Sequence, residues 1–306
     1  MSFQITTAFV DQFKANILLL SQQKESLIRQ VARVEDVTGD TLFVERVSAT
    51  QTQLISSRHG NTPLISTPHS RRKLTMADYN WADLIDNVDK LKMLIDPQST
   101  YAQNAVMAFN RTIDEVLITA LGGAAFGGHT GGTTILNSAA GECRLIDGDG
   151  AIVAAGSDHS GTTETPLTIA KLLTCKQLLD DAVIDDSRQR YFLCNPFNIN
   201  QLLNTTEVKS SDFNTVKALA MGQIDTFMGF KFIKSTLLSA NGTDTATTEC
   251  YAFAQDAIVL AISEEPTVRI SERDDKNYST QVYVEMSIGA TRVEGPAVVE
   301  ILLDTV

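Results

Sequence analysis

The strongest constraint on the fold is a segment, residues 38–76, that the sequence predicts to be a long β-hairpin with no core of its own. Thr41 to Val47 is rich in strand-forming residues, and Gly60-Asn61 is typical of a loop tip. Pro63 and Pro68 favour an extended returning limb. An isolated two-stranded hairpin is marginally stable in water, so we expect this one to lie against something else.

The charge pattern of the same region is unusual. Gln51 to Ala77 contains no Asp or Glu, although the whole chain has a formal net charge of −12. An acidic stretch follows directly. A basic arm beside an acidic face suggests docking between copies of one chain, whereas on charge alone an ordinary solvated loop is the simpler interpretation. The candidate interface residues are Arg58, His59, Arg71, Arg72 and Lys73 on the basic side, and Asp78, Asp83 and Asp86 on the acidic side.

Two helices are expected after the hairpin. Trp81 to Leu94 has apolar residues at helical spacing and acids on the opposite face. A longer helix is predicted over residues 97–121, because Pro97 suits the first turn and apolar residues recur at three- and four-residue steps. Gly122-Gly123 is placed to end this helix, which would be about 35 Å long at 1.5 Å per residue.

The remainder mixes short strands and helices without regular alternation, which favours an α+β fold over a doubly wound one. Arg190 to Cys194 and Phe227 to Ile233 are expected to be strands, and a helix is expected to begin at Asn195-Pro196. Gly127 to Gly132 lacks the ending of a phosphate-binding loop, so it is better interpreted as a turn into a β-hairpin.

Composition excludes several classes of protein. No run of 18 apolar residues exists, so no transmembrane helix is predicted. A pI near 4.8 argues against a protein that coats DNA, because phosphate binding needs a surplus of Lys and Arg. The cysteines lie far apart without a CxxC pair and are expected to be buried free thiols; they are Cys143, Cys175, Cys194 and Cys250.

The sequence offers little evidence of catalysis. Ser157, Asp158 and His159 bring suggestive residue types together, but adjacent positions point in different directions and the nucleophile-elbow spacing is absent. A hydrolase using this loop is kept as an alternative, and a polar loop that caps the next helix is the simpler interpretation. We find no metal-ligand spacing and no cofactor motif, so we expect neither a cofactor nor an enzyme.

Several patterns, in their order along the chain, resemble the major capsid proteins of tailed bacteriophages, which have the HK97-like fold. They are Ser57-Arg58-His59 with Pro68-His69-Ser70-Arg71-Arg72, Trp81-Ala82-Asp83-Leu84-Ile85-Asp86, Met93-Leu94-Ile95-Asp96-Pro97, Leu193-Cys194-Asn195-Pro196, Phe227-Met228-Gly229-Phe230, Ala257-Ile258-Val259-Leu260-Ala261 and Ile288-Gly289-Ala290-Thr291-Arg292. Each pattern is weak alone, but together they cover essentially the whole chain.

The resemblance implies a domain organisation. Residues 1–37 would form an N-arm, and residues 38–77 would form the E-loop, a hairpin that lies over the neighbouring subunit. A peripheral P-domain would take residues 78–160 and 265–306, with residues 97–121 as its spine helix. An axial A-domain would take residues 161–264.

The resemblance also implies a structural function: self-assembly into hexamers and pentamers that form an icosahedral head around double-stranded DNA. Such a protein is located in the virion and assembled in the bacterial host cytoplasm, without a membrane and without sequence-specific DNA binding. Its partners would be itself, a separate scaffolding protein, a portal and a decoration protein. The arginines of the hairpin would meet acids of another copy. An encapsulin-like nanocompartment shell is the alternative within the same fold.

Overall fold

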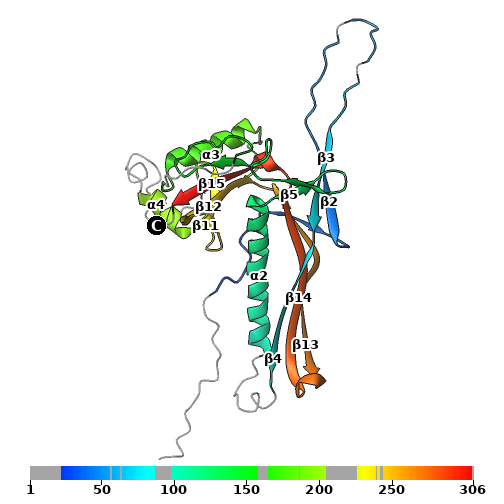
Figure 1. Cartoon of the computed structure of the whole chain (residues 1–306), viewed down its shortest axis with the longest axis vertical. Coiled ribbons are helices and arrows are strands. Elements are labelled where there is room, and N and C mark those ends of the chain that lie inside the picture. The colour runs from blue at the N-terminus through cyan, green and yellow to red at the C-terminus, as the bar shows by residue number, and fades with distance from the viewer. Residues whose placement is uncertain are drawn as a thin grey trace, which may run out of the picture. The chain divides into compact units, whose positions relative to one another are not determined.

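The structure is a computed structural model that describes residues 22–55, 57–62, 64–86, 98–157, 165–185, 187–204, 226–238, 240–241 and 244–304. The chain divides into two compact units. Unit 1 contains residues 1–25, 78–112 and 264–287, and unit 2 contains residues 26–77, 113–263 and 288–306. Figure 1 labels several elements of the two units.

Unit 2 contains the predicted hairpin. Strand β2 (Thr41–Val47) pairs antiparallel with β3 (His69–Thr75) in an unbroken register from Thr41↔Thr75 to Val47↔His69. The sheet continues through β5 (Ala125–Gly127) and β6 (Thr133–Ile135), in the order β2-β3-β5-β6. The hairpin prediction is therefore confirmed. The glycine-rich segment was predicted to be a turn that leads into a following hairpin; residues 128–132 are a turn, but it joins β5 to β6, which pair with each other.

A second sheet forms the main core of unit 2. Its strand order is β7 (Arg144–Ile146), β15 (Val298–Asp304), β12 (Asp244–Ala254), β8 (Arg190–Cys194), β10 (Phe230–Lys234) and β9 (Thr226–Phe227), and β11 (Ala240–Asn241) pairs with β12. Helix α3 (Ile169–Asp181) packs against this sheet through β15 (Figure 1). Helix α4 (Pro196–Asn204) follows β8 directly, as predicted.

This sheet takes strands from both predicted domains. Strands β7 and β15 come from residues assigned to the P-domain, whereas β8, β10 and β12 come from residues assigned to the A-domain. The apolar core is built around Phe192, which contacts the rings of Phe230 and Phe232. The predicted boundary between the P-domain and the A-domain would therefore cut through one hydrogen-bonded sheet. The domain limits stay a prediction.

The third sheet has the order β1-β13-β14-β4. In unit 2, β1 (Arg33–Asp36) runs parallel to the start of β13 (Ile258–Arg273). Strands β14 (Ser279–Arg292) and β4 (Ala77–Ile85) complete it, and the short 3-10 turns η2 (Asp274–Lys276) and η3 (Gly295–Ala297) precede and follow β14. The helix predicted over 81–94 is wrong for residues 81–85, which belong to β4; residues 87–94 lie outside the described residues.

Helix α2 (Gln98–Gly122) confirms the long helix predicted over residues 97–121. Within unit 2, its buried Asp114 accepts hydrogen bonds from the Ser26 hydroxyl and from the backbone N–H groups of Leu27 and Ile28. The end of the predicted N-arm is therefore anchored on its own chain. Of the helices that the structure describes, none is sufficiently long and apolar to cross a membrane.

All four cysteines are buried and free, as predicted. Burial raises the pKa of the Cys175 and Cys250 thiols to about 12, so these groups stay protonated at neutral pH. Within the described part of the chain, no group of three or more His, Cys, Asp or Glu side chains is placed to hold a metal ion.

Candidate assembly interface

The alternation of side chains along β3 sorts its cations onto two faces. Successive residues of a strand point to opposite sides, so Arg72 and Leu74 share one face while Arg71 and Lys73 share the other. We call the paired strands β2 and β3 the root of the hairpin. There, Leu74 is buried with Val37, Val44 and Met76 in an apolar cluster. The neighbouring positions Arg71 and Lys73 are partly exposed.

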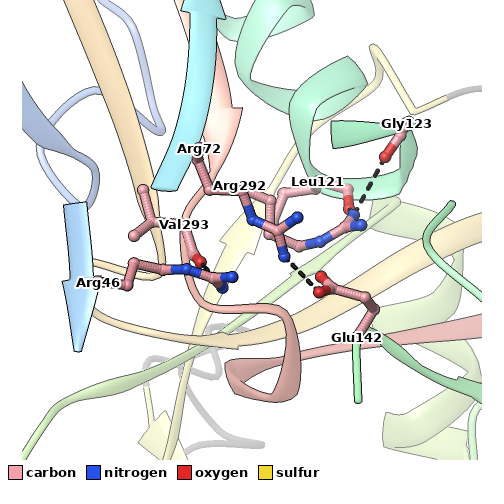
Figure 2. Close-up of polar contacts among 7 residues, drawn as sticks. All are labelled: Arg46, Arg72, Leu121, Gly123, Glu142, Arg292 and Val293. Atoms are coloured by element: carbon pink, nitrogen blue, oxygen red, sulfur yellow. Dashed lines mark hydrogen bonds and ion pairs between the residues drawn. The ribbon is translucent and has the colours of Figure 1, made fainter. Parts of the chain in front are cut away.

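Arg72 differs from the expectation that it meets an acid of another copy. Its side chain is fully buried, and its Nη2 atom forms an ion pair with Oε1 of Glu142 of the same chain (Figure 2). A side chain at Gly295 would collide with the backbone and carboxylate of Glu142, so glycine there allows Glu142 to reach Arg72. The strand register explains the difference, because Arg72 shares its face with Leu74 and must enter the interior.

Two further arginines lie beside Arg72 in Figure 2. Arg292, at the end of β14, donates from Nη1 to the backbone carbonyl oxygens of Leu121 and Gly123 and so caps the C-terminal end of α2. Arg46 of β2 donates from Nη1 to the carbonyl oxygen of Val293 at 2.7 Å. Together with Arg72 and Glu142 they form a group that we call the arginine cluster. The cluster joins the hairpin root to the rest of unit 2 of the same chain.

The opposite face of the root is open to solvent. Arg71 forms an ion pair with Glu45 at 3.1 Å, and its guanidinium lies 5.6 Å from the ring centre of Phe43. A cleft of about 480 Å³ lies here, between the two strands and the β5–β6 turn. Its lining residues are Glu45, His69, Ser70, Arg71, Gly128 and His129. The cleft therefore combines the Arg71–Glu45 ion pair with two imidazole rings. Sequence reasoning missed His69 and His129 because only the β3–β5 pairing brings them together.

Beyond the root, the limbs of the hairpin present apolar side chains to solvent. Leu54 is 92% exposed, Ile55 is 85% exposed and Leu64 is 93% exposed. Arg58 and His59 are also exposed, and His59 adopts a left-handed backbone conformation with φ 60° at the loop tip. A long segment that combines exposed leucines with cations has the composition of a surface that another molecule covers.

The predicted acidic residues lie in unit 1. Asp78 lines a groove of about 340 Å³ together with Glu264 and Glu285. Asp83 accepts a hydrogen bond from its neighbouring backbone N–H, and Asp86 accepts one from the Ser279 hydroxyl. All three predicted aspartates are exposed. Among the described residues, the partners of Asp83 and Asp86 are a backbone N–H and a hydroxyl group, so neither of these two contacts neutralises a carboxylate.

The loop considered for hydrolysis can be placed only in part. Ser157 is exposed, and residues 158–164, which include Asp158 and His159, lie outside the described residues.

Comparison with solved structures identifies the class of protein that this fold defines. The chain is similar to the capsid protein of cyanophage P-SCSP1u, with a TM-score of 0.75, 16% identity and coverage of 100% of this chain and 96% of that chain. It is also similar to the cyanophage Pam1 capsid protein (TM-score 0.71, 17% identity, 99% and 98% coverage) and to that of Helicobacter pylori bacteriophage KHP30 (TM-score 0.71, 11% identity, 99% and 98% coverage). The fold is HK97-like.

The family follows from the sequence itself. A family model described as phage capsid protein matches residues 5–305, so the chain belongs to that family. The comparison with curated proteins found no match. The protein is therefore a structural major capsid protein of the head of a tailed phage, located in the virion, and it assembles with copies of itself. No finding supports the nanocompartment or hydrolase alternatives.

Proposed function

We propose that the hairpin drives assembly by lying over unit 1 of a neighbouring copy, with its apolar limbs and its basic root both in the contact. The exposure of Leu54, Ile55 and Leu64 on the segment beyond the paired strands β2 and β3 is the observation that carries this proposal. Apolar side chains that are nearly fully exposed in the subunit gain free energy when a neighbour covers them.

The proposed receiving surface has matching chemistry. Strands β4 and β13 of unit 1 expose Leu84, Val268 and Ile270, which offer apolar contacts. Residues 78–86 carry three Asp and no Lys or Arg, and residues 264–287 carry six acids against three bases. Opposite charge on the two surfaces would guide the hairpin and fix its register, while apolar contact would supply affinity.

We propose a revised set of cations for this contact. Arg72 is removed from the proposed interface because it is buried, and His69 and His129 join it because they line the cleft beside Arg71. Arg58, His59, Arg71 and Lys73 remain the proposed basic contacts, and Asp78, Asp83 and Asp86 remain the proposed acidic contacts. The E-loop of this proposal is residues 38–77.

Further parts of the proposal rest on the family alone. We propose that the protein is assembled in the host cytoplasm with a scaffolding protein, a portal and a decoration protein as partners. We also propose that it has no catalytic role, because self-assembly accounts for its exposed surfaces. The division into N-arm, P-domain and A-domain belongs to the same proposal.

Charge reversal tests the docking directly. The variant Arg58→Glu with Arg71→Glu should prevent shell formation in sedimentation and electron microscopy while its circular dichroism stays that of the wild type, because both side chains are at the surface. Adding Asp78→Lys with Glu264→Lys should restore shells by restoring the charge match. Lys176→Glu with Lys231→Glu, two exposed positions away from the hairpin, is the control. Normal shells from the hairpin variant alone would overturn the proposal.

A further inference from the structure

The arginine cluster has more hydrogen-bond donors than the protein satisfies. Among the described protein atoms, five buried guanidinium nitrogen atoms have no acceptor, and one buried carboxylate oxygen, Oε2 of Glu142, has no donor. The nitrogen atoms are Nε of Arg46, Nε and Nη1 of Arg72, and Nε and Nη2 of Arg292. The side chains of Arg72 and Arg292 are both fully buried. Buried polar groups in folded proteins are almost always hydrogen-bonded, so this concentration of donors at one place requires an explanation.

The charges of the cluster are unbalanced as well. Three guanidinium groups share the carboxylate of Glu142, and the carboxylate of Glu294 also acts on Arg46. Glu294, which lies nearby in the chain, forms an ion pair with Arg188 at 2.7 Å. Burial lowers the pKa of Arg46, and repulsion from Arg72 lowers it further. Buried charge without a counter-charge is strongly unfavourable, and arginine does not lose its proton at physiological pH.

Figure 2 shows how the side chains of the arginine cluster lie. The guanidinium groups of Arg46, Arg72 and Arg292 lie in a row, and Glu142 approaches from one side of it. Four separate parts of unit 2 meet here: β2, β3, the segment before β7, and the end of β14. A group that bound all three arginines would therefore fasten the hairpin root to the rest of unit 2.

We propose that the arginine cluster binds a small inorganic anion, a halide or a small oxyanion, which accepts hydrogen bonds from the guanidinium groups of Arg72 and Arg292. Water could accept some of these hydrogen bonds, but it could not balance the surplus positive charge. The full burial of Arg72 and Arg292 excludes a side chain of another copy or a phosphate of packaged DNA. The anion stabilises the folded subunit, and this proposal does not depend on how the hairpin docks.

Thermal unfolding tests the proposal on the purified full-length protein. Stability is compared in sodium chloride, sodium phosphate and sodium gluconate at equal ionic strength and pH, because gluconate is a much larger anion than the other two. A specific anion at 100 times its Kd shifts the folding equilibrium by about 100-fold towards the native state. The melting temperature should therefore rise with chloride or phosphate and stay low in gluconate.

Two variants locate the effect. Arg46→Met removes one charge from the cluster and keeps the Arg72–Glu142 pair, so it should weaken the dependence on the anion. Arg71→Met, one position from Arg72 but on the open face, should keep it. Equal melting temperatures in all three salts, or an unchanged anion dependence in Arg46→Met, would overturn the proposal and leave water as the partner.

A direct measurement remains decisive if Arg46→Met does not fold. In crystals of the wild-type protein grown or soaked in sodium bromide, the anomalous signal of bromide should appear between the guanidinium groups of Arg72 and Arg292. Soaking at high concentration alone could also fill such a site, so the peak supports the proposal only together with the rise in melting temperature in chloride. The proposal is contradicted if the cluster shows no anomalous peak and the melting temperature is the same in all three salts.

Discussion

Replacing Leu54 and Leu64 by serine should impair assembly and leave the subunit folded. Both side chains are more than nine-tenths exposed in the subunit, so their loss should change its free energy of unfolding by less than about 0.5 kcal/mol. If a neighbouring copy covers them, each contributes about 2 kcal/mol to the contact through burial of apolar surface. The double variant would then lose about 4 kcal/mol per hairpin.

That loss has a measurable consequence. Because every 1.4 kcal/mol is a factor of ten in an equilibrium constant, the subunit concentration needed for shells should rise by roughly 1,000-fold. Light scattering across a concentration series, with electron microscopy of the products, measures this threshold. Val183→Ser is the matched control, because Val183 is 88% exposed on another part of unit 2. Assembly of Leu54→Ser with Leu64→Ser at the wild-type concentration would refute the proposed role of the hairpin limbs.

Two further predictions concern the subunit itself. Burial lowers the pKa of Lys171 from 10.5 to about 8, so the unfolded chain binds more protons between these values and the stability contributed at this position rises with pH across that window. In urea unfolding at several pH values, the free energy of unfolding of the wild type minus that of Lys171→Met should therefore rise across the window, because the buried thiols act equally on both proteins; parallel curves would count against it. Asp114→Ala removes the acceptor of three hydrogen bonds and should lower the free energy of unfolding, measured in urea, by about 3 kcal/mol. Glu115→Ala, at the exposed neighbouring position, should lower it little. Equal losses in the two variants would contradict the proposed anchoring of the N-arm by Asp114.

The sequence predicted the elements whose signals are local. The long helix is marked by its apolar spacing and by glycines at its end, and the hairpin by its turn residues and prolines. The stretch Trp81 to Ile85 was misassigned because its apolar residues fit a helical period, whereas pairing within a sheet decides its conformation. Tertiary contacts that lie far away in the sequence overrode the local pattern.

The candidate interface was predictable only in part. Charge identified the basic hairpin and the acidic stretch, but charge alone could not separate Arg71 from Arg72. The period of two did contain the signal, since Arg72, Leu74 and Met76 alternate with more polar residues. Glu142 lies 70 residues away from Arg72, so no local pattern could have shown their ion pair.

The most direct test of the central claim is a cryo-electron microscopy map of the assembled head at a resolution that shows side chains. We predict that residues 48–68 of each copy lie on strands β4, β13 and β14 of a neighbouring copy, with Leu54 and Leu64 covered and Arg71 facing carboxylates of that neighbour. A map in which these residues contact only their own copy, or extend into solvent while the shell is intact, would contradict the account.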